Sequence, residues 1–110
     1  MCIRDSQIAV YKVRDIHALE PSPYYLYARS SIYKTPFILV NNVGIIDTGY
    51  RGNLCAALHN KMSNSFSLLK MGTRMTQICM PALCPNFHVR MVNKLSDTSR
   101  GTGGFGSTGN

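Results

Sequence analysis

Turn-forming residues interrupt this 110-residue chain roughly every eight to twelve residues, so only short segments lie between them. These segments are rich in β-branched and aromatic residues, and none carries an apolar stripe with the ~3.6-residue period of a helix. Many short strands separated by regular turns are typical of a β-sandwich or a small β-barrel. The sequence therefore predicts one all-β domain with little helix.

Composition or apolar–polar alternation predicts strands at residues 24–27, 37–40, 54–59 and 87–92. Within 54–59, Leu54, Ala56 and Leu58 recur at every second position, as on one face of a strand. The segment 44–52 predicts a β-hairpin, with Asp47 at its turn and Tyr50 on the returning strand.

The formal charge is +7, from 12 basic and five acidic residues. An anionic partner would explain this charge, and so would an ordinary solvated basic surface. The few acids are more informative, because they leave acid–base chemistry with few carboxylate candidates: Asp5, Asp15, Glu20, Asp47 and Asp97. No apolar run approaches the ~20 residues of a membrane helix, and the first ten residues lack the apolar core of a secretory signal.

The four cysteines have no spacing typical of zinc ligands. Cys79 and Cys84, the closest pair, are five positions apart with Pro81 between them. We therefore expect free thiols in a reducing compartment rather than a metal site or a disulfide framework.

Two segments carry polar groups suited to nucleotide chemistry, although local chemistry alone leaves a structural role open for each. Residues 28–31 (Ala-Arg-Ser-Ser) place a guanidinium and two hydroxyls after an aromatic strand, and such groups suit either a phosphate or a surface turn. Asp47 is the carboxylate of the predicted hairpin, and it could act as a base or cap the turn beside Thr48 and Gly49.

The glycine-rich tail, residues 100–110, is a third such segment. Glycines let backbone N–H groups turn toward an anion, and Ser107 and Thr108 add hydroxyls. The tail lacks the lysine and the following helix of a P-loop. A plain linker would share its glycines but would not need Arg100 and Phe105. We expect a mobile arm that a bound ligand orders.

In combination, four segments resemble the second to fifth motifs of the trimeric dUTP diphosphatases (dUTPases), in order and in spacing. They are residues 28–31, 41–52, 72–77 and 100–109. The resemblance implies a distorted jelly-roll β-barrel or sandwich at 23–99, followed by a mobile carboxy-terminal arm at 100–110. It also implies hydrolysis of dUTP to dUMP and pyrophosphate, which cleans the nucleotide pool and supplies dUMP for dTMP synthesis.

The sequence departs from this family's pattern at two points. The first motif, an Ala-Gly-x-Asp-Leu type segment whose aspartate helps to position magnesium, is absent, so the chain resembles an amino-terminally truncated member. Residues 1–22 stay unassigned, and residues 1–6 resemble translated adapter sequence, which we interpret as an artefactual start. Thr73 stands where the family usually has a structural Asp or Glu.

The resemblance implies that Asp47 is the catalytic base, which orients and deprotonates the water that attacks the α-phosphorus. Tyr50 would stack under the deoxyribose and exclude a ribose 2′-hydroxyl. The uracil edge would be read by Asn41 and by the backbone of Gly44, Ile45 and Ile46.

The remaining substrate contacts implied by the resemblance are to the phosphates and the outer face of the base. The phosphates would be held by Arg29, Ser30, Ser31 and Gln77. The tail would contribute Arg100, Phe105, Gly106, Ser107 and Thr108. Of these, Arg100 would approach the γ-phosphate, Phe105 would cover the uracil, and the last three would close around the phosphate chain.

Mg²⁺ is the implied cofactor, bound mainly through the substrate phosphates with no protein ligand assigned. The implied assembly is a homotrimer with active sites shared between subunits, in which Asp47 and Arg100 of one site come from different chains. Neither a nucleic-acid partner nor a membrane is expected. The implied protein is soluble and intracellular, in the cytoplasm or the nucleus. A viral origin is compatible with this location.

Three alternatives compete with this interpretation. The related dCTP deaminases use a glutamate near the uracil hairpin, whereas Glu20, the only glutamate here, precedes the Arg-Ser-Ser segment. A non-catalytic dUTP-binding relative is favoured by the missing first motif and opposed by the intact Asp47, Tyr50 and tail. A single-strand nucleic-acid binder should interleave aromatic residues with cations, but residues 24–27 contain no cation.

Overall fold

The structure is a computed structural model that describes residues 2–4, 7–15, 18–62, 69–83 and 88–104. Within these residues, eight strands form three antiparallel sheets with the orders β6-β4-β8, β1-β7-β5 and β2-β3. The all-β prediction is confirmed, and the packed antiparallel sheets are consistent with a jelly-roll-like arrangement. In chain order the elements are β1 (Cys2–Arg4), β2 (Val10–Asp15), β3 (Ala18–Ser22), β4 (Tyr24–Ala28), the 3₁₀ helix η1 (Ser30–Lys34), β5 (Phe37–Leu39), β6 (Val43–Ile46), β7 (Cys55–Asn60) and β8 (Thr76–Cys79).

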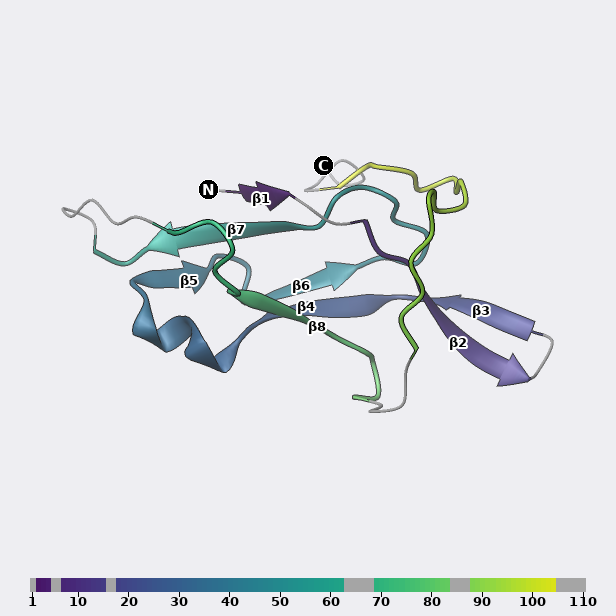
Figure 1. Cartoon of the computed structure of the whole chain (residues 1–110), viewed down its shortest axis with the longest axis horizontal. Coiled ribbons are helices and arrows are strands. Elements are labelled where there is room, and N and C mark those ends of the chain that lie inside the picture. The colour runs from purple at the N-terminus through teal and green to yellow at the C-terminus, as the bar shows by residue number, and fades with distance from the viewer. Residues whose placement is uncertain (1, 5–6, 16–17, 63–68, 84–87, 105–110) are drawn as a thin grey trace.

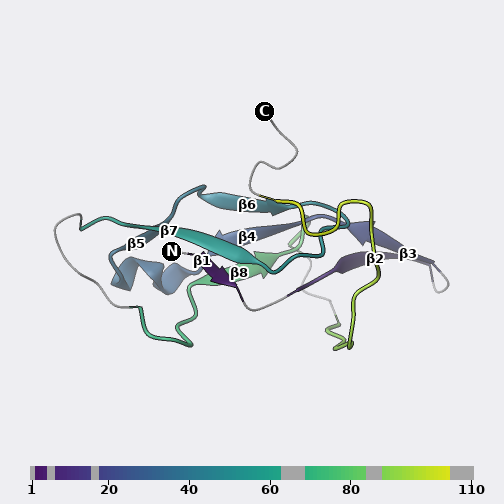
Figure 2. The same ribbon diagram turned by 90° about the horizontal axis from the view of Figure 1, so that it is seen from above.

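The three sheets are arranged around β4 and β7. Figures 1 and 2 show β4 between β6 and β8, with β7 and β5 alongside, while the β2–β3 hairpin projects from the rest of the fold. The yellow segment near the carboxy-terminal end lies close to the end of β6 (Figure 1). The helical element found in the described part of the chain is a five-residue 3₁₀ turn, and no membrane-spanning helix is found there.

The aromatic strand β4 is the centre of its sheet because it pairs along both edges. Leu26 lies opposite Gly44 of β6 and opposite Ile78 of β8. Side chains alternate along a strand, so Tyr24 and Leu26 are buried at 2% and 5% exposure. Directly opposed residues of paired strands project to the same face, so Gly44 of β6 lies on the face of the sheet where Leu26 is buried.

The main core lies between the β1-β7-β5 sheet and the segment before β8. It contains Phe37, Leu39, Ala56, Leu58 and Met75. The predicted alternation of β7 is confirmed, because the second and fourth residues of the strand are buried and their neighbours are more exposed. Burying one large side chain of this kind contributes about 1.5–3 kcal/mol, so this core holds β5 and β7 together.

The predicted β-hairpin at 44–52 is wrong, although the predicted turn is present. β6 pairs with β4, whereas β7 pairs with β5 and β1, so the two limbs enter different sheets. Between them the Tyr50 N–H donates to the Asp47 carbonyl at 3.1 Å, and Gly49 has a φ of 88°. A positive φ at this turn position favours glycine. Tyr50 then forms an isolated parallel bridge with Gly101 instead of returning along β6.

The strand predicted at 87–92 is also wrong for residues 88–92, which form no strand in the structure. Val89 and Met91, the apolar residues of the alternation, are 83% and 95% exposed. An alternating pattern forms a strand only where a neighbouring strand and a core receive it. Residue 87 lies outside the described residues.

Candidate functional site

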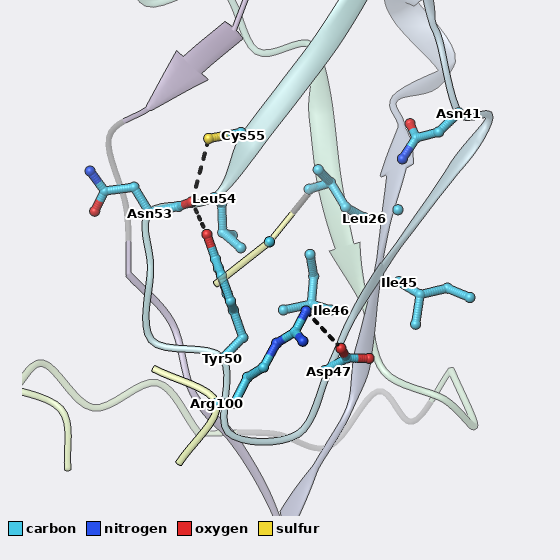
Figure 3. A pocket seen from close by; sticks show the side chains of 12 residues that line it. Leu26, Asn41, Ile45, Ile46, Asp47, Tyr50, Asn53, Leu54, Cys55 and Arg100 are labelled. Atoms are coloured by element: carbon cyan, nitrogen blue, oxygen red, sulfur yellow. Dashed lines mark hydrogen bonds and ion pairs between the residues drawn. The ribbon is translucent and has the colours of Figure 1, made fainter. Parts of the chain in front are cut away.

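A pocket of about 230 Å³ lies along β6 and the turn that follows it (Figure 3). Its lining includes seven residues that the sequence predicted as site residues: Asn41, Gly44, Ile45, Ile46, Asp47, Tyr50 and Arg100. Small-molecule sites usually enclose ~300–1,000 Å³, so this one is small. Figure 3 shows the reason, since the Arg100 side chain lies between Tyr50 and Asp47.

The pocket also contains residues that the sequence analysis missed. They are Leu26, Asn53, Leu54, Cys55 and Gly104. Three of them lie where the chain enters β7, and the incorrect hairpin prediction gave no reason to place β7 beside β6. The burial of alternate residues in β4 could have indicated Leu26, because its pairing partner Gly44 was already a predicted site residue.

Asp47 and Arg100 form an ion pair inside the pocket, with Arg100 Nη2 lying 3.1 Å from Asp47 Oδ2. The carboxylate side chain is 54% exposed and the arginine side chain is 23% exposed. Arg100 Nε is buried and has no hydrogen-bond partner among the described residues. A buried donor without a partner favours a bound acceptor, and a guanidinium is well suited to phosphate oxygens.

This ion pair lies within one chain, and the expectation that Asp47 and Arg100 of one site come from different chains of an assembly stays a prediction. Within this chain the segment around Gly101 lies against the turn that contains Tyr50. Arg51 N–H donates to the Gly101 carbonyl at 2.7 Å, directly beside Arg100. The backbone bridge between Tyr50 and Gly101 reinforces this position.

The Tyr50 ring is held against the backbone by two glycines and one hydrogen bond. Its hydroxyl donates to the Asn53 carbonyl at 3.0 Å. A Cβ added at buried Gly52 would lie 2.6 Å from Tyr50 Cζ, and one at Gly104 would lie 3.5 Å from Tyr50 Cε2. Because the ring packs directly on Gly52, any side chain at that position must displace the ring.

On the expectation that this pocket binds dUTP, replacing Gly52 by Ala should weaken binding of a non-hydrolysable dUTP analogue about tenfold, because overpacking of this kind costs about 1–3 kcal/mol. Gly104→Ala is the matched control, since its added Cβ makes an ordinary contact with the same ring. Titration calorimetry measures both affinities. Equal affinities for the two variants would show that the ring position does not matter for binding.

The residues predicted to read the uracil edge lie along an edge of the sheet. β6 pairs with β4 on one side and is the edge strand of its sheet, so half of its backbone polar groups face away from β4. Gly44 is buried, and a Cβ there would lie 3.1 Å from Leu26 Cβ and 3.7 Å from Asn41 Nδ2. The backbone of β6 and the Asn41 amide therefore approach the same part of the pocket, where they could bind the polar edge of a base.

The four predicted phosphate residues form a second group at the other end of β4, and none of them lines the pocket. Gln77 Nε2 donates to the Ala28 carbonyl at 3.2 Å, and Arg29 N–H donates to the Met75 carbonyl at 2.9 Å. Ser30 and Ser31 are exposed at the start of η1.

The distance between the two groups follows from the strand register. Tyr24 pairs with Ile46, and Arg29 follows Tyr24 by five positions. At about 3.3 Å per residue, this places Arg29 about 16 Å from Ile46, the neighbour of Asp47. No single arginine side chain bridges that gap, so one chain does not bring Arg29 and Asp47 to the same phosphate group.

The remaining predicted site residues, Phe105, Gly106, Ser107 and Thr108, lie outside the described residues. No group of three or more His, Cys, Asp or Glu side chains able to hold a metal ion occurs in the part of the chain that the structure describes. Asp47 is the one carboxylate among the residues that line the described pocket.

Tyr24 is buried in β4 and is not an acid–base group at neutral pH. The pKa of its hydroxyl is raised to about 12, chiefly by burial and also by the Tyr50 charge, while the Arg51 charge acts in the opposite direction. The hydroxyl donates to the Ile8 carbonyl at 2.9 Å, so it stays protonated and hydrogen-bonded.

Comparison with known proteins identifies the family. The dUTPase family profile matches residues 2–109. The chain is similar to a deoxyuridine 5′-triphosphate nucleotidohydrolase from Desulfitobacterium hafniense, at 39% identity over 87 residues, which are 77% of this chain and 56% of the relative. It is also similar to proteins of the same name from Picosynechococcus sp. (42% identity, 69% of this chain, 52% of the relative) and from Paramecium bursaria Chlorella virus 1 (42%, 60% and 45%).

The chain spans about half the length of the curated relatives that it matches. Its pocket contains seven predicted site residues in one place, and the family profile matches nearly the whole sequence. The chain belongs to the dUTPase family.

Proposed function

We propose that this chain forms a dUTPase, which hydrolyses dUTP to dUMP and pyrophosphate and so supplies dUMP and removes dUTP from the nucleotide pool. The observation that carries the proposal is the Asp47–Arg100 ion pair in a pocket formed by the β6 edge and Tyr50. One end of this pocket offers backbone groups for a base, and the other offers a carboxylate beside a cation.

In this proposal Asp47 is the general base that orients a water molecule for attack on the α-phosphorus. A general base must lie within hydrogen-bond reach of its water, and a carboxylate that is 54% exposed in a pocket can meet that requirement. Arg100 would exchange its contact with Asp47 for phosphate oxygens, which leaves the carboxylate available for the water. Tyr50, held on Gly52, would lie under the deoxyribose.

We further propose that Mg²⁺ enters with the triphosphate. Magnesium commonly keeps several of its waters and binds substrate phosphates, so the proposal assigns it no protein ligand and leaves Asp47 as the base. When bound, the ion would neutralise charge on the phosphate chain. The tail beyond residue 104, with Phe105 over the uracil and residues 106–108 around the phosphates, would close the site as an arm that follows the domain at 23–99.

The proposed assembly is a homotrimer in which the phosphate group around Arg29 of one subunit meets Asp47 of another. The separation of about 16 Å along β4 supports this, because residues that must hold the same triphosphate lie at opposite ends of the sheet within one chain. Cyclic assembly of identical chains would place one end of β4 beside the other end of a neighbour's β4.

The direct test is to incubate the chain with dUTP and Mg²⁺ in water labelled with oxygen-18, and to separate the products by chromatography and mass spectrometry. The proposal expects dUMP and pyrophosphate with the label in dUMP, because the water attacks the α-phosphorus. UTP and dCTP should be cleaved far more slowly. Tight dUTP binding without any product would instead favour a non-catalytic relative, and label in pyrophosphate would exclude attack on the α-phosphorus.

A further inference from the structure

The carboxylates of this chain are unevenly distributed along the sequence. Between Glu20 and Asp97 the single acid is Asp47, although the same stretch contains eight cations. These cations are Arg29, Lys34, Arg51, Lys61, Lys70, Arg74, Arg90 and Lys94. Eight cations and one acid give this stretch a formal charge of +7, which equals the charge of the whole chain.

Three lysines of this stretch lie on segments that meet at the η1 end of the fold. Lys34 is the last residue of η1, and the Lys61 N–H donates to the carbonyl of nearby Pro36 at 2.8 Å. Lys70 follows Leu69, which packs on the core that η1 also contacts. All three lysines are exposed, and no carboxylate pairs with any of them in the part of the chain that the structure describes. We call these three residues the lysine surface.

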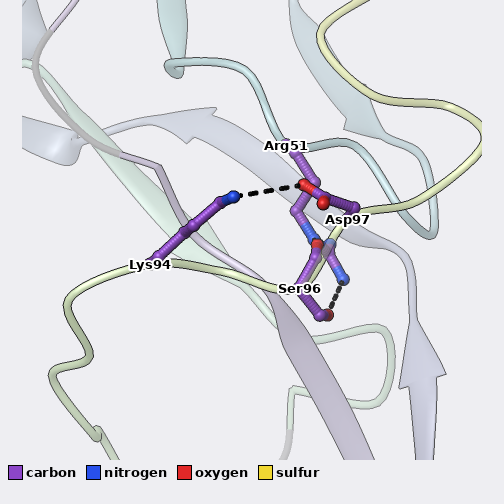
Figure 4. Close-up of polar contacts among 4 residues, drawn as sticks. All are labelled: Arg51, Lys94, Ser96 and Asp97. Carbon is purple, nitrogen blue, oxygen red and sulfur yellow. Dashed lines mark hydrogen bonds and ion pairs between the residues drawn. The ribbon is translucent and has the colours of Figure 1, made fainter.

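Cations at the other end of the fold have carboxylate neighbours. Figures 1 and 2 show η1 and the β2–β3 hairpin at opposite ends of the longest axis. Lys12 of β2 lies directly opposite Glu20 of β3, and opposed residues of paired strands project to the same face. Close to β2, Lys94 reaches Asp97 at 3.9 Å (Figure 4). The positive charge without nearby carboxylates is therefore concentrated at the η1 end.

Arg51 belongs to the acid-poor stretch, but its guanidinium already has partners within the chain. Its Nε donates to the Ser96 carbonyl at 2.6 Å (Figure 4), and its Nη2 donates to the Tyr11 hydroxyl at 3.1 Å. These bonds use donors that a ligand would otherwise need. Arg51 is therefore not part of the lysine surface.

The lysine surface adjoins the predicted phosphate group. The helix η1 begins directly after Arg29, with Ser30 as its first residue and Lys34 as its last. The Arg29 N–H donates to the carbonyl of Met75, which follows Lys70 by five positions. A triphosphate is a polyanion, so a surface of positive charge attracts it before any contact with Arg29 forms.

From this placement we infer that Lys34, Lys61 and Lys70 capture the phosphate chain of a nucleoside triphosphate and speed its association with the Arg29 group. The identity of the ligand rests on the proposed function, whereas the charge distribution does not. A lysine ammonium is a compact, strongly hydrated charge on a flexible stem, which suits attraction through water better than bonding at fixed angles. Surfaces of one sign can raise association rates by about 10–1,000-fold.

The test compares two double variants that remove the same charge from opposite ends of the fold. Lys34→Gln with Lys70→Gln acts on the lysine surface, and Lys12→Gln with Lys94→Gln is the matched control. Stopped-flow measurement with a non-hydrolysable dUTP analogue gives the association and dissociation rates. At about 20 mM salt the first variant should associate about fivefold more slowly than the parent, and the control within about twofold of it. Dissociation rates should be the same in all three proteins.

The salt dependence separates capture from direct contact. At about 0.5 M salt the two variants should associate at the same rate, because charges are then screened over a few ångström. Circular dichroism should show that both variants are folded. Equal association rates for the two variants at low salt would overturn the inference. Slower association that persists at high salt would also overturn it, because it would indicate a direct contact.

A second probe keeps this inference separate from the proposed function. If the parent chain does not bind the dUTP analogue, the proposed function fails, and inorganic tripolyphosphate replaces the analogue in the same comparison. The lysine surface should then still make association of tripolyphosphate slower in the Lys34→Gln, Lys70→Gln variant than in the control. Equal rates for the two variants, or no binding of tripolyphosphate to the parent at about 20 mM salt, would overturn the capture surface.

Discussion

Replacing Asp47 by Asn should lower kcat for dUTP hydrolysis by about a thousandfold, within the range expected for loss of a general base. The amide keeps the shape of the carboxylate, and its oxygen can still accept a hydrogen bond from Arg100, but it cannot take a proton from water. Binding of a non-hydrolysable dUTP analogue should therefore stay within about threefold of the parent. Steady-state kinetics gives kcat, and titration calorimetry gives the affinity.

Asp97→Asn is the control for this substitution, because Asp97 is an exposed carboxylate that forms a weak ion pair with the Lys94 ammonium at 3.9 Å. It should leave kcat unchanged. A kcat for Asp47→Asn within tenfold of the parent would remove Asp47 from the role of base, whatever the binding result. A large loss of affinity would show that the carboxylate mainly shapes the pocket.

Mixing two inactive variants, Asp47→Asn and Arg29→Ala, should restore about a quarter of the parental activity. Each variant is purified, both are unfolded, and they are refolded together in equal amounts. If Asp47 and Arg29 of one site come from different chains, each donor chain is intact half the time, so about one site in four is complete. If both came from one chain, every site would carry a defect.

Native mass spectrometry should confirm that mixed trimers form, and each variant refolded alone should stay inactive. An inactive mixture that contains mixed trimers would exclude sharing between these two groups. The 16 Å separation along β4 would then have to be closed by a change of conformation within one chain.

The sequence could predict the elements whose patterns are local. The aromatic segment 24–27 became β4, and the alternation in 54–59 became β7, because each pattern matches the two faces of a strand. The motif between Asn41 and Tyr50 was also sufficient to predict half of the residues that line the pocket, since the turn at Gly49 keeps its residues close together.

What the sequence could not predict depends on contacts between distant residues. The segment after Tyr50 looks like the second limb of a hairpin, yet β7 pairs with β5 and β1, because its buried residues meet Phe37 and Leu39. The hydrogen bonds of Arg51 could not be predicted for the same reason, since its partners Tyr11 and Ser96 lie 40 and 45 positions away in the sequence.

The two-sided pairing of β4 also limits how this sequence can change. One residue inserted into β4 would exchange its faces, so that Tyr25 and Tyr27 would turn toward the core in place of Tyr24 and Leu26. The same insertion would move Arg29 about 3.3 Å further from Asp47. Substitutions in β4 that preserve the alternation would change neither the distance from Arg29 to Asp47 nor the face on which each side chain lies. Evolution or design can therefore vary the composition of β4 widely, whereas its length has to stay constant.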